Sequence, residues 1–283
     1  AIERRHDMVE ALVSSPGLSE PVSEYLQEIY DLERLVSKLS TRRINPRELQ
    51  HLRRSLENAN KIREQLEQKE ELKLLASQID PCEALIKLIT ESLKEEPPVQ
   101  VAKGEVMASG ISNDLDELRD LKTSGKDRLL EIQQREAEAT GIASLKIAFN
   151  NVFGYYLEVR NTYKDKVPES WIRKQTLVNA ERYITEELKE YEQKILGAEE
   201  NILSLEQELY QKLLEQCAEF IDIIQKNAQT LGRIDCLLGF SLLARKQNYV
   251  RPRINEGRKL EVKDGRHPVI EQQLPVGESY VAN

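Results

Sequence analysis

The sequence predicts a mainly α-helical, elongated protein, in which a helical core continues into long antiparallel helices with a small β-rich insert at their tip. Charged residues form 32% of the 283 residues and aromatic residues only 5%, a composition typical of long, partly exposed helices. Apolar residues recur every three or four positions over most of the chain, which is the helical period. Between residues 141 and 185 this period stops, and aromatic and β-branched residues take over.

Four helices are predicted in the first 100 residues. The first covers residues 2–13 and the second residues 21–40, each with apolar positions at helical spacing. The third begins at Asn45, which can cap the helix and is followed three positions later by Glu48, the arrangement of a capping box. A fourth helix, over residues 80–93, opens with the same pattern.

Two longer helices are predicted on either side of the insert. Residues 113–140 carry apolar residues at a seven-residue period, and Gly141 can end this helix. Residues 186–231 carry a coiled-coil seam over three heptads. Because the connection between the helices is short, the two seams bury each other only if the helices run antiparallel.

The composition changes near the end of the chain. One more helix is predicted over residues 233–249, and Arg251 with Pro252 closes it. Residues 259–262 and 269–271 resemble strands of a further domain. The predicted domains are a first helical part (1–140), the insert (141–185), a second helical part (186–250) and the beginning of another domain (251–283).

The insert is predicted to be a small β structure. Strands are expected over residues 145–150, 153–160 and 175–184, with a tight connection over residues 150–154. Between residues 141 and 180, six Lys or Arg residues stand against three Asp or Glu residues, in a chain of net charge −8. A module of this size needs a core, which we expect its aromatic residues to form: Phe149, Phe153, Tyr156 and Trp171.

Polar residues of the insert indicate a phosphate-binding surface. They gather at turns and on one predicted strand: Asn150, Asn151, Arg173, Lys174, Gln175, Thr176 and Asn179. Arg and Lys supply charge to phosphates, and Asn, Thr and backbone N–H groups add neutral hydrogen bonds, so such a set positions a duplex without reading its sequence. The residues alone are equally compatible with an ordinary solvated face.

Several other function classes have no support in the sequence. The three histidines lack Cys, Ser or paired-carboxylate neighbours at ligand or triad spacing, and there is no GxxxxGK[ST] loop, so no catalytic centre is expected. Cys82, Cys217 and Cys236 lie far apart, which predicts single buried thiols in a reducing compartment. No apolar run reaches the ~20 residues of a membrane span.

A basic cluster between residues 42 and 54 is a second candidate for nucleic-acid binding. Its members are Arg42, Arg43, Arg47, Arg53 and Arg54. Acids such as Glu48 and Glu57 are interleaved with them, so a solvated helix face with local ion pairs is the preferred interpretation. The acidic total charge also argues against binding over the whole surface, because affinity for nucleic acid rests on neutralised phosphates.

Several segments of the chain resemble the MutS family of DNA mismatch repair proteins. The most specific are GYYLEV at 154–159 and QTLVNAERYI at 175–184, and DGRHPVIEQ at 264–272 agrees with them. NPRELQHLRRSL at 45–56 and DLDELRDL at 114–121 fit the helical middle of that family. The resemblance covers essentially the whole chain.

The resemblance implies a function for the insert. In this family the helical part forms a core and levers, and the insert is a clamp that grips the DNA backbone. The clamp contacts correspond to Arg173, Thr176 and Asn179, with Asn150 and Lys174 as weaker correspondences. Tyr280 and Val281 correspond to a site before the ATPase phosphate loop, where an aromatic residue stacks on adenine beside an apolar one.

The resemblance also implies a longer parent protein. The family's mismatch-reading N-terminal domain and its phosphate loop are absent, so we expect a truncated chain that is not itself an enzyme and holds no cofactor. The implied parent is a DNA-dependent ATPase that uses ATP and Mg. It acts as a homodimer on mismatched double-stranded DNA with a MutL-type partner, in the bacterial cytoplasm at the nucleoid and away from membranes.

Two alternatives stay open from the sequence. One is a structural coiled-coil arm whose tip binds another protein, with Tyr155 or Trp171 in the contact, as in chromosome-organising ATPases. The other is the clamp region of a MutS paralogue that acts outside mismatch repair.

Overall fold

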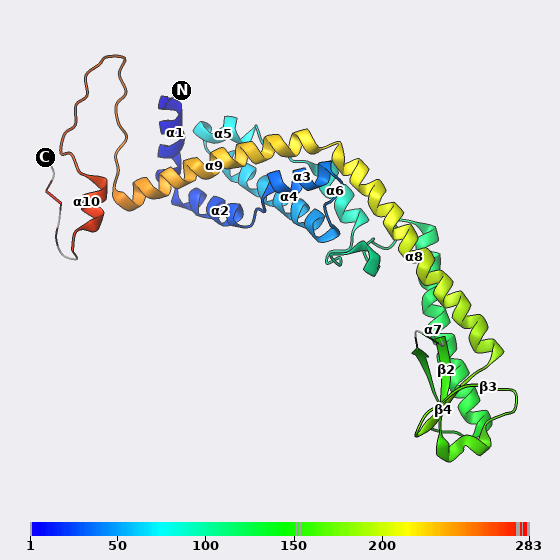
Figure 1. The fold of residues 1–283 in the computed structure, drawn as a ribbon. Coiled ribbons are helices and arrows are strands. Elements are labelled where there is room, and N and C mark those ends of the chain that lie inside the picture. The colour runs from blue at the N-terminus through cyan, green and yellow to red at the C-terminus, as the bar shows by residue number, and fades with distance from the viewer. Residues whose placement is uncertain (1, 151, 153, 276–277, 279, 282–283) are drawn as a thin grey trace.

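The computed structural model describes residues 2–150, 152, 154–275, 278 and 280–281. It shows a mostly helical chain with one small antiparallel sheet, as the composition predicts. A helical body continues into a long, bent arm of two helices, and the sheet lies at the far end of this arm (Figure 1). Helices α1 and α10 lie at the opposite end of the molecule from the sheet (Figure 1).

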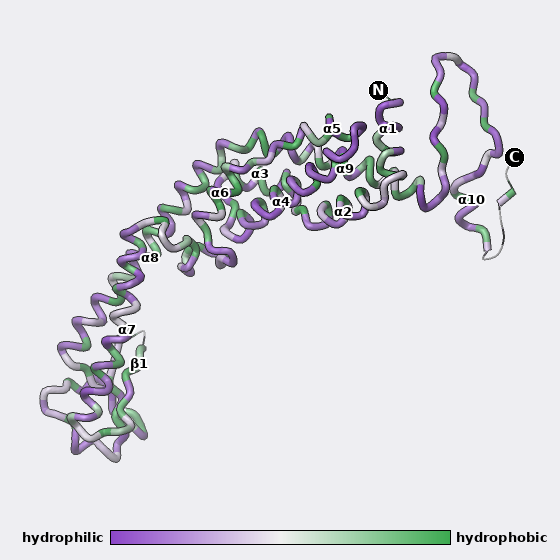
Figure 2. Tube along the Cα trace, turned by 180° about the vertical axis from the view of Figure 1, so that it is seen from behind, coloured by the Kyte–Doolittle hydropathy of each residue, from purple (hydrophilic) through white to green (hydrophobic). Residues whose placement is uncertain are grey.

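Seven helices build the body. They are α1 (Ile2–Val13), α2 (Pro16–Gln27), α3 (Leu32–Ser40), α4 (Pro46–Leu66), α5 (Glu70–Ala76), α6 (Glu83–Ser92) and α9 (Ile221–Gln247). Apolar and polar residues alternate along these helices (Figure 2), as amphipathic helices require. The apolar sides meet in one core, where Leu49, Leu52 and Leu56 of α4 are fully buried. Each such side chain contributes about 2 kcal/mol through removal of apolar surface from water.

The start of α4 confirms the predicted capping box. The Asn45 side chain accepts a hydrogen bond from Glu48 N (3.0 Å), and the Glu48 carboxylate accepts one from Asn45 N (3.1 Å). Pro46 occupies the first turn, where no backbone donor is needed. The sequence therefore specifies this helix start locally, before any packing is considered.

The predicted helix over residues 21–40 is two helices. α2 starts earlier than predicted, at Pro16, so the segment that ends α1 also opens the next helix. α3 starts at Leu32, where the Asp31 side chain accepts a hydrogen bond from Arg34 N (2.9 Å). The apolar spacing continues across the break and conceals it, and α5 is a further helix that the prediction lacks.

The predicted cap at Asp80 is also wrong. α6 begins at Glu83, and Cys82 before it has a left-handed backbone with φ 49°. The Asp80 carboxylate accepts from Cys82 N (2.8 Å) instead of from the first turn of the helix. Asn227 of α9, fully buried, bonds to both Asp80 N and Asp80 O at 2.8 Å. A contact from a distant helix thus decides how α6 starts.

Helices α7 (Asn113–Thr140) and α8 (Glu186–Ala218) form the arm. Lys122 near the start of α7 pairs with Glu199 (3.1 Å), and Arg135 near its end pairs with Glu187 at the start of α8, so the helices run antiparallel as predicted. Gly125 allows their close approach, because a Cβ there would lie 2.7 Å from a side-chain carbon of Ile195.

The ends of α7 agree with the prediction to within one residue. Ser112, one position before the predicted start, caps the helix by accepting from Leu115 N (3.4 Å). Gly141 ends the helix in the left-handed conformation, with φ 65°. Glycine adopts this conformation without the steric cost of a side chain, which is why it terminates helices.

The predicted boundary between a helix over residues 186–231 and another over 233–249 is wrong. α8 ends at Ala218 and α9 runs without interruption from Ile221 to Gln247. At the break, Glu219 N and Phe220 N bond to carbonyls three residues back (3.3 and 3.1 Å), which tightens the last turn. Neither Pro nor Gly stands at this break, so the local sequence carries no signal for it.

The insert forms a four-stranded antiparallel sheet in the order β1-β2-β4-β3. Its strands are β1 (Lys146–Asn150), β2 (Gly154–Arg160), β3 (Ile172–Thr176) and β4 (Ala180–Ile184), and the 3₁₀ helix η2 (Asn161–Lys166) follows β2. A second core, separate from that of the body, lies between one face of the sheet and the arm. It includes Leu157, Trp171 and Tyr183 of the insert and Leu129 and Leu188 of the arm.

The third predicted strand, over residues 175–184, is a hairpin of two strands. Thr176 pairs with Glu181, and the chain turns through residues 177–179. The first two predicted strands are confirmed as β1 and β2. The turn between them falls partly on Asn151 and Phe153, which lie outside the described residues.

The strands predicted after residue 251 do not form in the part of the chain that the structure describes. Residues 259–262 form no strand and pair with no sheet among the described residues. Leu260 is therefore 89% exposed. Residues 269–271 belong to the short helix α10 (Pro268–Gln273). Within the described residues, no helix is long and apolar enough to cross a membrane. The predicted domain boundaries stay a prediction.

Candidate nucleic-acid interface

The sheet presents one edge strand, β3, on the side away from β1. β2 and β4 occupy the centre of the sheet, and residues of both pack against the arm. Most residues of β3 are exposed. An irregularity between Arg173 and Gln175 shifts the register in which β3 pairs with β4. β3 and its turn are therefore held in place by the sheet while their side chains face water.

Four of the predicted contact residues lie together on β3 and its turn. Arg173, Lys174 and Thr176 belong to β3, and Asn179 lies in the turn that follows; all four are exposed. The Arg173 guanidinium lies 3.3 Å from the Glu181 carboxylate and keeps 60% of its side chain exposed. These four side chains offer two cations and two neutral hydrogen-bonding groups along one edge.

Asn150 does not join this group. It ends β1, on the opposite edge of the sheet, and its side chain accepts a hydrogen bond from Val152 N (2.8 Å). Asn150 pairs with Gly154 at one end of β2, whereas Arg160 at the other end pairs with Ala180 beside the β3–β4 turn. The structure thus places Asn150 at the far corner from Asn179, and Asn151 lies outside the described residues.

The cations of the insert divide into paired and unpaired ones. Arg182 is used internally: its Nε lies 3.3 Å from the Glu158 carboxylate, its Nη1 donates to Gln175 Oε1 (2.8 Å), and its guanidinium lies 4.3 Å from the Tyr156 ring centroid. Arg160 and Lys174 have no carboxylate within 4.0 Å among the described residues, and both are exposed. Unpaired positive charge therefore lies at the β3 edge and the adjoining end of β2. The described chain also places exposed lysines without a carboxylate partner on β1 (Lys146) and η2 (Lys164 and Lys166).

Glu181 of β4 contacts two side chains beside this edge. It receives the Arg173 guanidinium and accepts a hydrogen bond from the Tyr183 hydroxyl. Burial, and then the Glu181 carboxylate, raise the pKa of Tyr183 to about 12. The phenol therefore stays protonated and acts as a fixed donor, which holds the Glu181 carboxylate beside Arg173.

Sequence reasoning missed two residues at the same corner. Arg160 ends β2 next to the turn, and Asn161 donates its side-chain amide to the Val178 carbonyl (2.9 Å) and its backbone N–H to the Asn179 carbonyl (3.1 Å). The pairing of β2 with β4 places these two residues beside the turn. A single predicted strand over residues 175–184 contains no such turn, so the sequence did not indicate their position.

The predicted aromatic core of the insert is partly confirmed. Trp171 is 7% exposed and belongs to the core between sheet and arm; Tyr156 is 5% exposed but lies outside that core, with the Arg182 guanidinium over its ring. Phe149 is 46% exposed and packs at a tilt on Tyr155, with ring centroids 5.0 Å apart. Phe149 lies on the same face of the sheet as Ile147 and Tyr155, which pack on the core, but it is near the end of the edge strand β1 and is covered less. Phe153 lies outside the described residues.

The basic cluster of the body is largely occupied by ion pairs. Arg53 is buried and contacts the carboxylates of Glu57 and Glu95 at 2.7 Å, and Arg54 contacts Glu95 at 3.0 Å. Arg42 pairs with Glu215 of α8 at 2.9 Å. Ion pairing is therefore confirmed for these three arginines, but only Arg53–Glu57 is local; Arg54 and Arg42 pair with acids from distant segments, and Arg53 is buried and not solvated.

Cysteines and histidines form no chemical site in the described residues. Burial raises the pKa of the Cys82 and Cys217 thiols to about 12 each, whereas Cys236 is exposed, contrary to the prediction. The His51 ring stacks on Tyr30 with centroids 4.0 Å apart, and burial lowers its pKa. No group of three potential metal ligands is found among the residues described.

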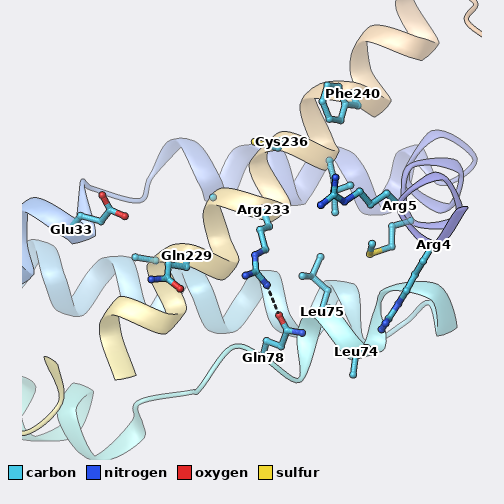
Figure 3. A pocket seen from close by; sticks show the side chains of 14 residues that line it. Arg4, Arg5, Glu33, Leu74, Leu75, Gln78, Gln229, Arg233, Cys236 and Phe240 are labelled. Atoms are coloured by element: carbon cyan, nitrogen blue, oxygen red, sulfur yellow. Dashed lines mark hydrogen bonds between the residues drawn. The ribbon is translucent and has the colours of Figure 1, made fainter. Parts of the chain in front are cut away.

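A groove of about 960 Å³ crosses the body between α1, α5 and α9 (Figure 3). Arg233 of α9 bonds to Gln78 across it (3.4 Å), and Leu74 and Phe240 add exposed apolar surface. Its described lining includes the exposed thiol of Cys236 but no histidine. Tyr280 is half-buried and Val281 exposed in the segment after α10, away from the sheet (Figure 1).

Comparison with known proteins identifies the class to which the arm and its sheet belong. Residues 110–201 match MutS family domain IV, a range that begins just before α7, includes the whole sheet and ends within α8. A helix pair that carries a small sheet at its end is thus the part of the chain that this domain describes.

The whole chain matches curated relatives with the same name. It is 52% identical to the DNA mismatch repair protein MutS of Christiangramia forsetii and to that of Phocaeicola vulgatus, and 50% identical to that of Bacteroides fragilis. Each match covers 100% of this chain and 33% of the relative. The chain belongs to the MutS family and spans about a third of the length of these relatives.

Proposed function

We propose that residues 141–185 bind the sugar–phosphate backbone of duplex DNA without reading its sequence, as the clamp of a mismatch repair protein. The observation that carries this proposal is the row of exposed groups on β3 and its turn, within the range that matches MutS family domain IV. Lys174 and Arg160, unpaired in the described chain, supply charge, and Thr176 and Asn179 supply neutral hydrogen bonds.

The length of this row suits a DNA backbone. Residues of a strand advance about 3.3 Å each, so the row from Arg173 to Thr176 is about 10 Å long. Duplex DNA carries one charge per about 1.7 Å of its axis, so a row of this length faces several phosphates at once. Arg173 and Arg182 each have a carboxylate neighbour, which leaves Arg160, at the end of β2, as the unpaired arginine beside this row in the described chain.

The arm is the proposed lever of this clamp. It joins the sheet to the body through two antiparallel helices with ion pairs along their length. A load on the sheet therefore reaches the body through packed side chains and not through a flexible linker. In the longer protein, we propose that this connection links DNA binding to an ATPase domain.

The proposals for the longer protein rest on the family alone. They are ATP with Mg as cofactors, with Tyr280 and Val281 beside the nucleotide, a homodimer around mismatched DNA, and a MutL-type partner. The proposed place of action is the bacterial nucleoid, where the DNA lies. Within these 283 residues we propose binding without catalysis.

A protein-binding tip is the second candidate. Val178 is 91% exposed and Ile172 is 52% exposed, which gives the β3 edge some apolar surface. Trp171 and Tyr155 belong to or pack on the core of the insert, so their substitution would disturb folding before any contact. The relatives are named mismatch repair proteins, which favours the DNA proposal over a paralogue outside that pathway.

Replacing Lys174 by Gln tests the proposal. In the full-length protein, binding to a mixed-sequence duplex is expected to weaken for every sequence, and the slope of log K against log salt is expected to fall by about one unit. Fluorescence anisotropy over a salt series measures both quantities. Lys87→Gln, on the exposed face of α6, is the matched control and leaves both unchanged. An unaltered slope for Lys174→Gln would contradict a phosphate contact.

A further inference from the structure

The turn between β3 and β4 is held by a residue from another part of the chain. Asn161 donates its side-chain amide to Val178 O (2.9 Å) and its backbone N–H to Asn179 O (3.1 Å). Leu177 N donates to Ala180 O (2.8 Å) and closes the turn. The carbonyl groups of Val178 and Asn179 therefore both accept hydrogen bonds from Asn161, which fixes their orientation.

The two central N–H groups of the same turn are unused. Val178 N and Asn179 N donate to no acceptor within the residues that the structure describes. Val178 is 91% exposed and Asn179 is exposed, so a ligand in solution can reach this side of the turn. Backbone N–H groups are among the donors that bind phosphate oxygens, and here no free central carbonyl competes with or repels the anion.

Positive charge surrounds this turn. Arg160 is the last residue of β2 and pairs in register with Ala180, which follows the turn. Lys174 and the Thr176 hydroxyl precede it on β3. The described residues place no carboxylate within 4.0 Å of Arg160 or Lys174. The nearest acid of the hairpin, Glu181, is already engaged by Arg173 and Tyr183.

We propose that residues 177–180 form a backbone phosphate site for duplex DNA, with Arg160 as a contacting cation and Asn161 as the residue that positions the turn. This inference rests on the proposed function and adds to it the donors, the cation and the positioning residue. A single phosphate group accepts from the N–H groups of Val178 and Asn179, while the charge of Arg160 attracts it.

Amide resonances of the ¹⁵N-labelled 283-residue chain test this site directly, since chemical shifts report weak binding. The Val178 and Asn179 amides are expected to shift when a mixed-sequence duplex is added at low salt. In Asn161→Ala, half-saturation of these shifts is expected at about fivefold more duplex, the effect of one lost neutral hydrogen bond. Asn201→Ala, exposed on α8, is the matched control and leaves the titration unchanged.

Two further measurements separate positioning from charge. Asn161→Ala keeps the salt slope of binding because it removes no charge, whereas Arg160→Gln lowers the slope by about one unit. Unchanged Trp171 fluorescence shows that each variant keeps the fold of the insert, whose core contains this side chain. A lower slope for Asn161→Ala, or an unchanged one for Arg160→Gln, would overturn the assigned roles.

The outcomes also separate this inference from the proposed function. If amides of β3 respond to the duplex and those of Val178 and Asn179 do not, the turn site is wrong and the proposed function stands. If no amide between residues 172 and 180 responds, both are wrong. Inorganic phosphate at the same phosphate concentration is expected to cause no shift, and equal shifts would overturn the assignment to duplex DNA.

Discussion

At the scale of single residues, only some of the positive charges counted in the sequence of the insert are accessible to a ligand. Arg182 and Lys174 count equally in the sequence, yet Arg182 is bound to Glu158, Gln175 and Tyr156, while Lys174 is exposed and unpaired in the described chain. A substitution of Arg182 would therefore affect the sheet itself, and one of Lys174 only its surface.

Gly154, the first residue of β2, has a backbone conformation that favours glycine. Its φ is 74°, a conformation that costs a non-glycine residue about 1–3 kcal/mol, and an added Cβ would overlap the Glu192 carboxylate. Gly154→Ala is therefore expected to lower the unfolding free energy of the insert by at least 1 kcal/mol. Trp171, the single tryptophan, lies in the core of the insert, so its fluorescence in a urea titration follows this unfolding.

Gly17→Ala provides the control for that substitution. Gly17 lies in α2, has no atom within 4 Å of the added Cβ, and is not among the glycines with positive φ. Its replacement is expected to leave stability unchanged or slightly higher, because alanine is the better helix former. Equal stability of the Gly154 and Gly17 variants would show that the turn does not need glycine.

At the scale of elements, the sequence predicts those that are specified locally. The capping box of α4, the glycine that ends α7 and strands β1 and β2 all follow from nearby residues. The β3–β4 hairpin was missed because its turn, Leu-Val-Asn, lacks the glycine that commonly marks such turns. The break between α8 and α9 likewise has no local signal and depends on how the arm joins the body.

The candidate interface likewise contains residues that are neighbours in the sequence and residues that only the fold brings together. Arg173, Lys174, Thr176 and Asn179 are neighbours in sequence, and the structure keeps them together. Asn150 was separated from them, and Arg160 and Asn161 were brought to them, by the strand order β1-β2-β4-β3. Strand order depends on packing over the whole insert, which residue patterns do not encode.

The junction of arm and body depends on one buried ion pair. Arg119 Nη2 of α7 lies 2.6 Å from Glu206 Oε1 of α8, Glu206 is fully buried, and both residues bond to the backbone of residues 106–107. Arg119→Met leaves the Glu206 charge buried without a cation beside it and is expected to cost about 3–5 kcal/mol of unfolding free energy. Urea denaturation followed by circular dichroism measures this loss.

A double variant distinguishes an unpaired charge from lost packing. Arg119→Met with Glu206→Leu removes both charges at similar volume and is expected to recover most of the stability. Arg63→Met, which breaks the half-exposed pair of Arg63 with Glu67 at the end of α4, is expected to change stability far less. If the single and double variants at the junction were equally unstable, packing and not charge would explain the loss.

At the scale of the whole molecule, the chain separates a helical body from a small sheet by the length of an arm (Figure 1). Each end has its own core, one in the body and one at the sheet. The candidate contacts therefore lie far from the helices that line the groove, α1, α5 and α9, and from the segment after α10 (Figure 1). Binding at the sheet can be measured without direct interference from either.

Hydrogen exchange with and without duplex DNA tests the central claim, that the sheet at the end of the arm holds the DNA backbone. In the full-length protein, exchange is expected to slow in peptides that cover residues 172–180, and equally for duplexes of unrelated sequence. Protection that is absent from these residues, or that depends on the DNA sequence, would contradict a non-specific backbone contact at β3 and its turn.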